Sequence, residues 1–337
     1  MNLDQTATNA PCGVRLAGTG SYVPAGILTN DDLSKMMDTN DEWIVQRTGI
    51  NERRVLDPAT ESHFSMALAA IRGALEDAKM DGSELDLIIV GTVSMAMTCP
   101  STACRISHEI GAAPAGAFDL TAACSGFLYA MNLADSLIRS GRHKNIGIIG
   151  VEALSTIVDY TDRGSAILFG DAAGAAILCA DENPNRGCIY QRIEADGRDW
   201  KTLYMPEKEE DVFEGDASTN KLCTLRMLGR DVYKFAVTKF QWAIQDALDF
   251  TGLAAEDIGV YICHQSNLRI IDSAIEKLGL PRENVFVNID KYGNCSSASV
   301  GLCLDQLRKE GRVPEGKPVV LVAFGGGLTW ASSVWIP

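Results

Sequence analysis

The chain has 337 residues, of which 46% are hydrophobic and 22% are charged, so it has enough apolar residues for a large buried core. Its formal net charge of −14 at pH 7 argues against a nucleic-acid partner, because phosphate binding depends on an excess of lysine and arginine. No apolar run is long enough to span a membrane, and the polar start does not resemble a secretion signal, so we expect a cytoplasmic protein without a membrane partner.

Along the chain, polar and apolar segments follow one another in a regular way. The first 12 residues are polar, and we expect a mobile N-terminal tail. Apolar runs that suit buried strands lie at 87–90, 146–151, 260–262 and 319–323, with stretches of helical periodicity between them. This alternation predicts an α/β architecture. Residues 207–220 are acidic and polar, so we expect a surface loop there.

The sequence also repeats itself over a long distance. Residues 74–92 align without a gap on residues 247–265, an offset of 173 that superimposes two of the predicted strands. Cys124-Ser125 and Cys295-Ser296 match at nearly the same offset. Two matches in the same order indicate duplication of a whole α/β half rather than a short repeat. We place the boundary in the turn-rich segment near 180–190, which gives halves at 13–185 and 186–337.

The chain contains ten cysteines, most of them in apolar surroundings, and no Cys-x-x-Cys pair. We therefore expect small core side chains in a reducing compartment, and no metal site. Cys124 is distinctive because it follows a short apolar strand and precedes the helical stretch 128–138. A helix N-terminus favours the thiolate, the nucleophilic form of cysteine. Taken alone, however, a single cysteine among ten more often serves packing.

One of the four histidines stands apart from the others. His63, His108 and His143 lie on charged or amphipathic stretches that suit solvated faces. His264 follows the predicted strand at 260–262 and opens a helix, and strand ends are where α/β folds place their chemistry. A buried imidazole that is satisfied by a backbone partner is the competing interpretation.

Two small-residue turns complete the candidate site. The turn at 292–299 is the counterpart of the Cys124 turn in the internal repeat, so the symmetry places Asn294 beside Cys124, although an isolated Asn would more often cap the next helix. The glycines at 325–327 end the last predicted strand and can offer N–H donors to an oxyanion, with a plain tight turn as the alternative. Neither this run nor Gly18-Thr19-Gly20 matches a phosphate or dinucleotide fingerprint.

At these residues the chain, from Val14 to Pro337, closely resembles the β-ketoacyl-acyl-carrier-protein synthase III family, which starts fatty-acid elongation. The resemblance rests on the turns around Cys124, His264 and Asn294, the terminal glycine run, and the segments 18–24, 41–50, 161–164 and 169–171. It implies a homodimer with a thiolase-like fold. Two duplicated α/β halves would be related by pseudo-twofold symmetry and layered α/β/α/β/α.

The resemblance also implies an activity and a set of site residues. The reaction would be the decarboxylative condensation of an acyl-CoA primer with malonyl-acyl-carrier protein, without cofactor or metal. Cys124 would accept the acyl group, His264 and Asn294 would be its catalytic partners, and the backbone N–H groups of Cys124 and Gly326 would form the oxyanion hole. The implied CoA and substrate contacts are Trp43, Arg47, Thr48, Arg163, Gly229, Asn267 and Phe324, and the implied carrier-protein contacts are Gln265, Ser266, Asn267, Leu268 and Arg269.

Some positions depart from the commonest family pattern. Ser266 stands where Ala is frequent, Cys295 where Thr is frequent, and Arg230 where Asn is frequent, and none of these changes removes a catalytic group. Cys99 stands where acetyl-preferring members carry a Phe that closes the acyl pocket of the partner subunit. The loss of that ring predicts room for longer or branched primers, unless Met95 or Met97 refills the space.

Two other functions remain compatible with the sequence. A specialised starter or condensing enzyme of polyketide or alkylquinolone synthesis would share the same three residues. A catalytically silent acyl-CoA-binding protein would share the fold, but the intact set of Cys124, His264 and Asn294 argues against it. A thiolase would need a second catalytic cysteine, and a hydroxymethylglutaryl-CoA synthase would need a glutamate base, and neither is apparent at these motifs.

Overall fold

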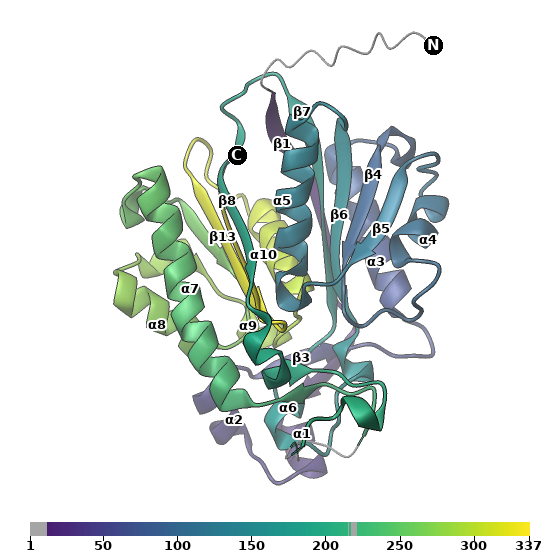
Figure 1. Cartoon of the computed structure of the whole chain (residues 1–337), viewed down its shortest axis with the longest axis vertical. Coiled ribbons are helices and arrows are strands. Elements are labelled where there is room, and N and C mark those ends of the chain that lie inside the picture. Colours follow the sequence, from purple (N-terminus) through teal and green to yellow (C-terminus); the bar gives the residue numbers. More distant parts are fainter. Residues whose placement is uncertain (1–11, 215, 217–220) are drawn as a thin grey trace.

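The computed structural model describes residues 12–214, 216 and 221–337, so most of the expected tail at 1–12 and the end of the expected loop at 207–220 lie outside it. The expected α/β architecture is confirmed, with two five-stranded sheets (Figure 1). The first contains β1 (Gly13–Tyr22), β4 (Leu87–Gly91), β5 (Gly116–Leu120), β6 (Asn145–Glu152) and β7 (Ala172–Asp181). The second contains β8 (Gly187–Ala195), β11 (Val260–Cys263), β12 (Val285–Phe286), β13 (Val319–Gly325) and β14 (Thr329–Ile336).

The two sheets are copies of one another in topology. Their strand orders are β5-β4-β6-β7-β1 and β12-β11-β13-β14-β8. In each sheet the first three strands of that order are parallel and the last two pair antiparallel to their neighbours. The fold is thus the expected pair of duplicated halves. Since β7 ends at Asp181 and β8 begins at Gly187, we propose the boundary between the halves in the turn that joins these strands.

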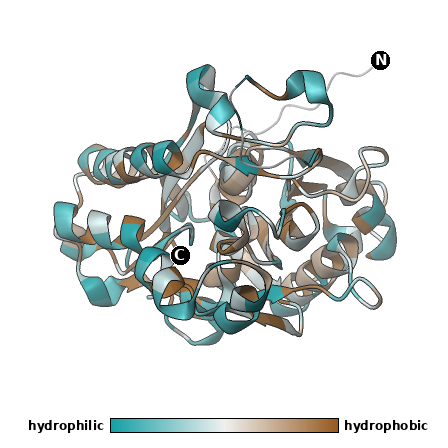
Figure 2. Cartoon of the chain, turned by 90° about the horizontal axis from the view of Figure 1, so that it is seen from below, coloured by the Kyte–Doolittle hydropathy of each residue, from teal (hydrophilic) through white to brown (hydrophobic). Residues whose placement is uncertain are grey.

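The helices form three layers around the two sheets, which gives the order α/β/α/β/α (Figure 1). The middle layer consists of α5 (Gly126–Arg139) and α10 (Ala298–Lys309), which contact strands of both sheets. The outer layers are α3 (His63–Ala78) with α4 (Thr102–Glu109), and α7 (Gly229–Thr251) with α8 (Leu268–Leu278). On the outer helices, hydrophilic and hydrophobic residues alternate, as expected when one face covers a sheet (Figure 2).

The middle layer packs closely against the sheets because small residues stand at the contacts. A Cβ atom on Gly174 of β7 would lie only 2.5 Å from the backbone of Gly301 and Leu302 in α10. The largest apolar cluster runs through this layer and joins residues of both halves, among them Ile89, Phe127, Leu304 and Leu321. The two halves therefore share one core, and the ends of α5 and α10 are held in fixed positions relative to each other.

Smaller elements gather at one end of the molecule, near the N-terminal ends of α5 and α10 (Figure 1). They are β2 (Gly26–Thr29), α1 (Asn30–Met36), α2 (Asp41–Thr48), β3 (Glu52–Val55), α6 (Arg163–Ala166), β9 (Leu203–Tyr204), β10 (Arg226–Met227) and α9 (Ile289–Tyr292). Within the described ranges, no helix is both long and apolar enough to cross a membrane. The cysteines are less uniform than expected, because Cys99, Cys104 and Cys223 are exposed, although none of the ten forms a disulfide.

Candidate active site

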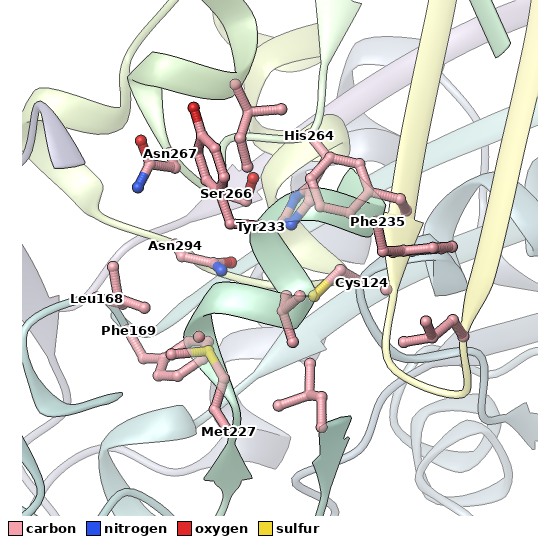
Figure 3. Close-up of a pocket in the computed structure, with 17 residues that line it drawn as sticks. Cys124, Leu168, Phe169, Met227, Tyr233, Phe235, His264, Ser266, Asn267 and Asn294 are labelled. Carbon is pink, nitrogen blue, oxygen red and sulfur yellow. The ribbon is translucent and has the colours of Figure 1, made fainter. Parts of the chain in front are cut away.

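Three side chains that are far apart in the sequence meet in one pocket. Cys124, His264 and Asn294 all line it, and Figure 3 shows the sulfur, the imidazole and the amide turned toward the same space. His264 directly follows β11, Cys124 lies in the turn that opens α5, and Asn294 lies between α9 and α10, so the fold itself brings them together. The pairing of Asn294 with Cys124 that the internal repeat suggested is found in the structure.

Cys124 lies in a short 3-10 turn, Ala123–Ser125, that leads directly into α5. The preceding residue, Ala123, has a positive φ of 46°, and Ser296 in the opposite half has a φ of 45°. Ala123 and Ser296 are 173 residues apart, which is the offset between the repeated strands, so they occupy equivalent positions in the two halves. Burial raises the pKa of Cys124 to about 12, a hydrogen bond with Ser296 lowers it, and the charge of Glu152 raises it. The helix terminus therefore acts against a strong desolvation effect, and Cys124 rests as a thiol.

His264 is held by its backbone and by one ring nitrogen. Its N–H donates to the carbonyl of Val322, and its Nδ1 lies 2.7 Å from the Oγ atom of Ser299. The ring meets the ring of Phe324 edge-on, with centroids 5.3 Å apart. Nε2 is buried without a protein partner. Burial lowers the pKa of His264 to about 3, so the imidazole is neutral at physiological pH and offers Nε2 to a ligand.

Asn294 is fixed through both its backbone and its side chain. Its N–H donates to Leu168, its carbonyl accepts from Gly170, and a parallel bridge joins it to Phe169. Its Oδ1 accepts a 2.8 Å hydrogen bond from the N–H of Ser296. That bond assigns the amide orientation and leaves Nδ2 as a donor toward the pocket (Figure 3).

The glycine run at the end of β13 lies against the Cys124 turn. A Cβ atom on Gly325 would lie 2.6 Å from the backbone nitrogen of Cys124, so no larger residue fits there. Thr329 fastens the two segments, because its hydroxyl lies 2.9 Å from the carbonyl oxygen of Ala122 and 3.2 Å from that of Gly326. The glycine run and the Cys124 turn therefore lie directly against each other, and Cys124 and Gly326 both line a cavity at this point.

Two cavities meet at Cys124. The one that contains His264 and Asn294 has a volume of about 90 Å³, and the other has a volume of about 360 Å³. The larger cavity is mainly apolar, and Leu203 of β9 lines both. The hydrophobic walls of the larger cavity are formed by Val93, Met95, Leu154, Phe169, Leu203, Met205 and Leu225.

The residues expected to bind CoA form two groups in the structure. Trp43 lies between two guanidinium groups, with Arg47 at 4.7 Å and Arg163 at 4.9 Å from its ring. A planar base could stack between Trp43 and Arg163 only if Arg163, which donates to the carbonyl of Asp38, moved away. Thr48 is buried, and its hydroxyl donates to Ile44 within α2, so it does not offer a contact at the surface.

Gly229, Asn267 and Phe324 line the smaller cavity, as expected for residues along a substrate arm. Asn267 also caps α8, since its Oδ1 accepts from the N–H of Arg269. Its Nδ2 donates to the carbonyl of Arg47, which links α8 to the last turn of α2. Leu168 and Phe169 of the first half also line this cavity, so both halves of the chain contribute to it.

The segment expected to contact a carrier protein is only partly at the surface. Arg269 is exposed and lies over the ring of Tyr233 at 5.3 Å. Gln265, in contrast, is buried, and its amide bonds to Cys263, Phe286 and Asn288, so a direct carrier-protein contact by this side chain does not fit. Ser266 is buried and lines the smaller cavity. Asn267 and Leu268 are partly exposed.

Three further findings concern His63, Cys99 and Glu152. His63 was expected on a solvated face, but this was wrong, because it is buried and its Nε2 lies 2.8 Å from the hydroxyl of Thr92. Cys99 is exposed and does not line the larger cavity of its own chain. Glu152, which sequence reasoning missed, is fully buried beside the site. The only feature of the sequence that could have indicated Glu152 is a carboxylate directly after the apolar run at 146–151.

Comparisons with known proteins give a consistent result. The family described as 3-oxoacyl-[acyl-carrier-protein (ACP)] synthase III matches residues 118–197, and its C-terminal part matches residues 248–336. A protein of Caldanaerobacter subterraneus subsp. tengcongensis named beta-ketoacyl-[acyl-carrier-protein] synthase III is 45% identical over 320 residues, which is 95% of this chain and 96% of that protein.

Two solved structures are similar over nearly the whole fold. The 3-oxoacyl-[acyl-carrier-protein] synthase III of Aquifex aeolicus VF5 superimposes with a TM-score of 0.89 at 41% identity, covering 96% of this chain and 100% of the other. The priming beta-ketosynthase of the R1128 polyketide biosynthetic pathway superimposes with a TM-score of 0.88 at 36% identity, covering 96% of each chain.

Proposed function

The chain belongs to the β-ketoacyl-[acyl-carrier-protein] synthase III family, and on that premise we propose that Cys124, His264 and Asn294 carry the reaction. The protein is an acyltransferase that condenses an acyl-CoA with malonyl-acyl-carrier protein in fatty-acid synthesis. The products are 3-oxoacyl-acyl-carrier protein, CoA and CO2.

In the first half-reaction, the sulfur of Cys124 attacks the thioester carbonyl of the acyl-CoA. The carbonyl oxygen becomes negatively charged and is stabilised by the N–H groups of Cys124 and Gly326, each donor contributing about 2.7–4 kcal/mol. The intermediate collapses, CoA leaves, and the acyl group stays on Cys124. The larger apolar cavity, which starts at Cys124, receives the hydrocarbon part of the acyl group.

In the second half-reaction, malonyl-acyl-carrier protein enters through the smaller cavity and loses CO2. The electron pair of the broken bond passes to the thioester oxygen as an enolate, which needs hydrogen-bond donors. Nε2 of the neutral His264 and Nδ2 of Asn294 supply them, so no cofactor is used. The enolate carbon then attacks the acyl carbonyl on Cys124 and releases the thiolate.

The observation that carries this proposal is the buried Nε2 of His264, which lacks a protein partner and lies in the same pocket as Cys124 and Asn294. A buried polar atom without a partner is costly unless a ligand satisfies it. The test is to incubate the protein with radiolabelled acyl-CoA and to look for label bound to the protein. Labelling should be lost in Cys124→Ser, and a silent acyl-CoA-binding protein would not be labelled covalently at all.

We also propose that the primer is longer or more branched than acetyl. The cavity of about 360 Å³ beyond Cys124 is larger than a two-carbon group needs, and its walls are flexible and apolar, including Met95 and Met205. Cys99 would contribute by leaving the pocket of the partner subunit open. This part of the proposal rests on the cavity and on the family comparison, since Cys99 does not line the cavity of its own chain.

A second candidate function is the priming condensation of a polyketide pathway. The likeness to the R1128 priming beta-ketosynthase, at 36% identity over 96% of both chains, supports it. The same three residues would act in the same order, so the primer and the carrier protein would differ rather than the chemistry. Offering the protein a mixture of a malonyl-loaded fatty-acid carrier protein and a malonyl-loaded polyketide carrier protein, and measuring which one is converted to the 3-oxoacyl product, would decide between these functions.

The remaining proposals concern partners and location. We propose that the protein is cytoplasmic and forms a homodimer. The homodimer is supported by β5, which forms a free sheet edge within the described chain and on which Phe118 is 38% exposed. We propose that CoA stacks on Trp43 after Arg163 moves aside, and that Arg47, Gly229, Asn267 and Phe324 line its path. Arg269 is the proposed carrier-protein contact.

A further inference from the structure

A buried carboxylate lies behind Cys124 and has no part in the reaction as described so far. Glu152, at the end of β6, is fully buried, and each of its two oxygens has its own set of hydrogen-bond donors. Oε2 accepts from the hydroxyl of Ser94 at 2.6 Å and from the N–H of Val93 at 3.2 Å. Oε1 accepts from the hydroxyls of Ser296 at 3.1 Å and Ser297 at 2.9 Å.

Ser296 connects this carboxylate to the nucleophile. It lines the larger cavity together with Cys124, its hydroxyl donates to Oε1 of Glu152, and its hydrogen bonding lowers the pKa of the Cys124 thiol. Its position is well defined, because its N–H donates to Oδ1 of Asn294 and its backbone has a positive φ of 45°. Ser297, the next residue, shares the contact with Glu152 but does not line either cavity at Cys124.

The charges of these groups depend on each other. A negative Glu152 raises the pKa of Cys124, and burial raises the pKa of both groups. Two negative charges so close together in a buried site are unfavourable, whereas one negative charge is well stabilised by the hydrogen-bond donors around Glu152, which include the hydroxyl of Thr92, and by the helix terminus. The site therefore favours a single negative charge, either on the carboxylate or on the sulfur, and Ser296 lies between these two positions.

We propose that Ser296 transfers the thiol proton of Cys124 to Glu152 when the acyl-CoA is attacked, so that Glu152 acts as a positioning residue that holds this proton. The S–H bond of Cys124 breaks and its proton moves to Oγ of Ser296. The hydroxyl proton of Ser296 moves at the same time to Oε1 of Glu152. The thiolate then attacks the thioester, and when CoA leaves, the proton returns from Glu152 through Ser296 to the CoA sulfur. Atoms and charge balance without any other reactant.

This inference rests on the proposed role of Cys124 as the acyl acceptor, and the test separates the two. The rate of self-acylation is measured in a single turnover with radiolabelled acyl-CoA in the matched variants Ser296→Ala and Ser297→Ala. Both lose one hydroxyl bonded to Oε1 of Glu152, but only the first loses the link to Cys124. We expect Ser296→Ala to be slower than the wild type by about 10-fold or more, and Ser297→Ala by less than about twofold.

A second pair of variants distinguishes proton transfer from packing. Glu152→Gln keeps the length of the side chain but cannot take up a proton, whereas Glu152→Asp keeps the carboxylate on a shorter chain. Proton transfer predicts that Glu152→Asp acylates faster than Glu152→Gln, and a packing role predicts the reverse. Asp171→Asn, which removes another buried carboxylate, bonded to Ser155 and Leu56, is the control for the loss of a buried charge.

The outcomes are unambiguous. Equal rates for Ser296→Ala and Ser297→Ala would overturn the proton transfer. Faster acylation in Glu152→Gln than in the wild type would overturn it as well, because removing a charge that merely repels the thiolate should accelerate the attack. Slower acylation in Ser296→Ala than in Ser297→Ala, together with Glu152→Asp exceeding Glu152→Gln, supports it. If Cys124→Ala were still labelled, the acyl acceptor itself would be wrong, and the proposed function would fail before this inference is tested.

Discussion

Nδ1 of His264 lies 2.7 Å from the hydroxyl oxygen of Ser299, the second residue of α10. If the hydroxyl donates to Nδ1, the proton of the neutral imidazole must be on Nε2, which faces the pocket. An Nε2–H donor is the form that the enolate requires. In this arrangement Ser299 stabilises the Nε2–H tautomer of His264 from outside the pocket.

The first prediction follows from this contact. Ser299→Ala should slow the decarboxylation of malonyl-acyl-carrier protein by about 10-fold, because the Nε2–H tautomer loses its stabilising hydrogen bond. Self-acylation of Cys124, which does not need His264, should change by less than about twofold. Measuring release of labelled CO2 and uptake of labelled acyl group on the same preparation checks both. A parallel loss of the two activities would mean that the substitution disturbs the whole site.

The second prediction concerns the division of labour at the site. Cys124→Ala should abolish acyl transfer, whereas His264→Ala and Asn294→Ala should still self-acylate. Each of the latter should lose condensation by about 10²–10³-fold, the usual effect of removing one donor to a developing oxyanion. The rate of condensation is measured from the formation of 3-oxoacyl-acyl-carrier protein. Wild-type condensation in either donor variant would show that the enolate is stabilised elsewhere.

The third prediction concerns the carrier protein. Arg269 is exposed at the start of α8, beside Tyr233 of the smaller cavity, and Lys277 is exposed near the end of the same helix. Because the chain has a net charge of −14, an acidic partner needs such a local basic surface to overcome repulsion. Arg269→Glu should raise the KM for malonyl-acyl-carrier protein and leave self-acylation by acyl-CoA nearly unchanged.

The control for this charge reversal is Lys144→Glu, an exposed lysine just before β6, at the strand end opposite to Glu152. It changes the net charge by the same amount as Arg269→Glu. A similar rise in KM in both variants would attribute the effect to overall charge, and the proposed contact at Arg269 would have to be abandoned.

The fourth prediction concerns the primer. The wild type should use isobutyryl-CoA or octanoyl-CoA at least as well as acetyl-CoA, since each buried methylene adds about 0.8 kcal/mol of binding in an open apolar cavity. Cys99→Phe should restore a preference for acetyl-CoA. Comparing kcat/KM for the three primers in both proteins checks this. A steep fall from acetyl-CoA to octanoyl-CoA in the wild type would show that the cavity does not accept the longer chain.

The fifth prediction concerns stability in acid. Burial lowers the pKa of His63 from 6.5 to about 4, so between these values the unfolded chain binds a proton at this site and the folded chain does not. The free energy of unfolding therefore falls as the pH falls through this window, with His63 contributing up to about 1.4 kcal/mol per pH unit. His63→Gln should make the fall shallower, whereas His108→Gln, on the exposed face of α4, should not. Urea unfolding at several pH values measures the difference.

Sequence patterns predicted four strands well, because each of these is a short apolar run that is buried along almost its whole length. Strands with exposed positions, such as β5 and β8, were not among them. The runs at 87–90 and 260–262 became β4 and β11 almost without change of bounds. The repeat also placed Asn294 correctly, since a duplicated fold carries equivalent turns to equivalent places.

The environment of Cys124 could not be derived in this way. The donors to Glu152 come from two segments that are about 200 residues apart in the sequence, 92–94 and 296–297, and a carboxylate after an apolar strand looks like the start of a surface turn. For the same reason His63 was wrongly expected on a solvated face, because it lies in a charged or amphipathic stretch, whereas in the structure it is buried against Thr92, which follows β4. Burial of a single polar group depends on tertiary packing, which periodicity does not report.

The bridge between Phe169 and Asn294 ties an amide donor of the second half to a loop of the first. A chain cut in the turn between β7 and β8 would yield two fragments, one with the thiol and one with the imidazole and the amide. Neither fragment alone could orient Asn294, because Leu168 and Gly170 supply its backbone partners from across the cut. Activity in a mixture of the fragments would thus report their association, which makes this fold a natural candidate for a split-enzyme sensor.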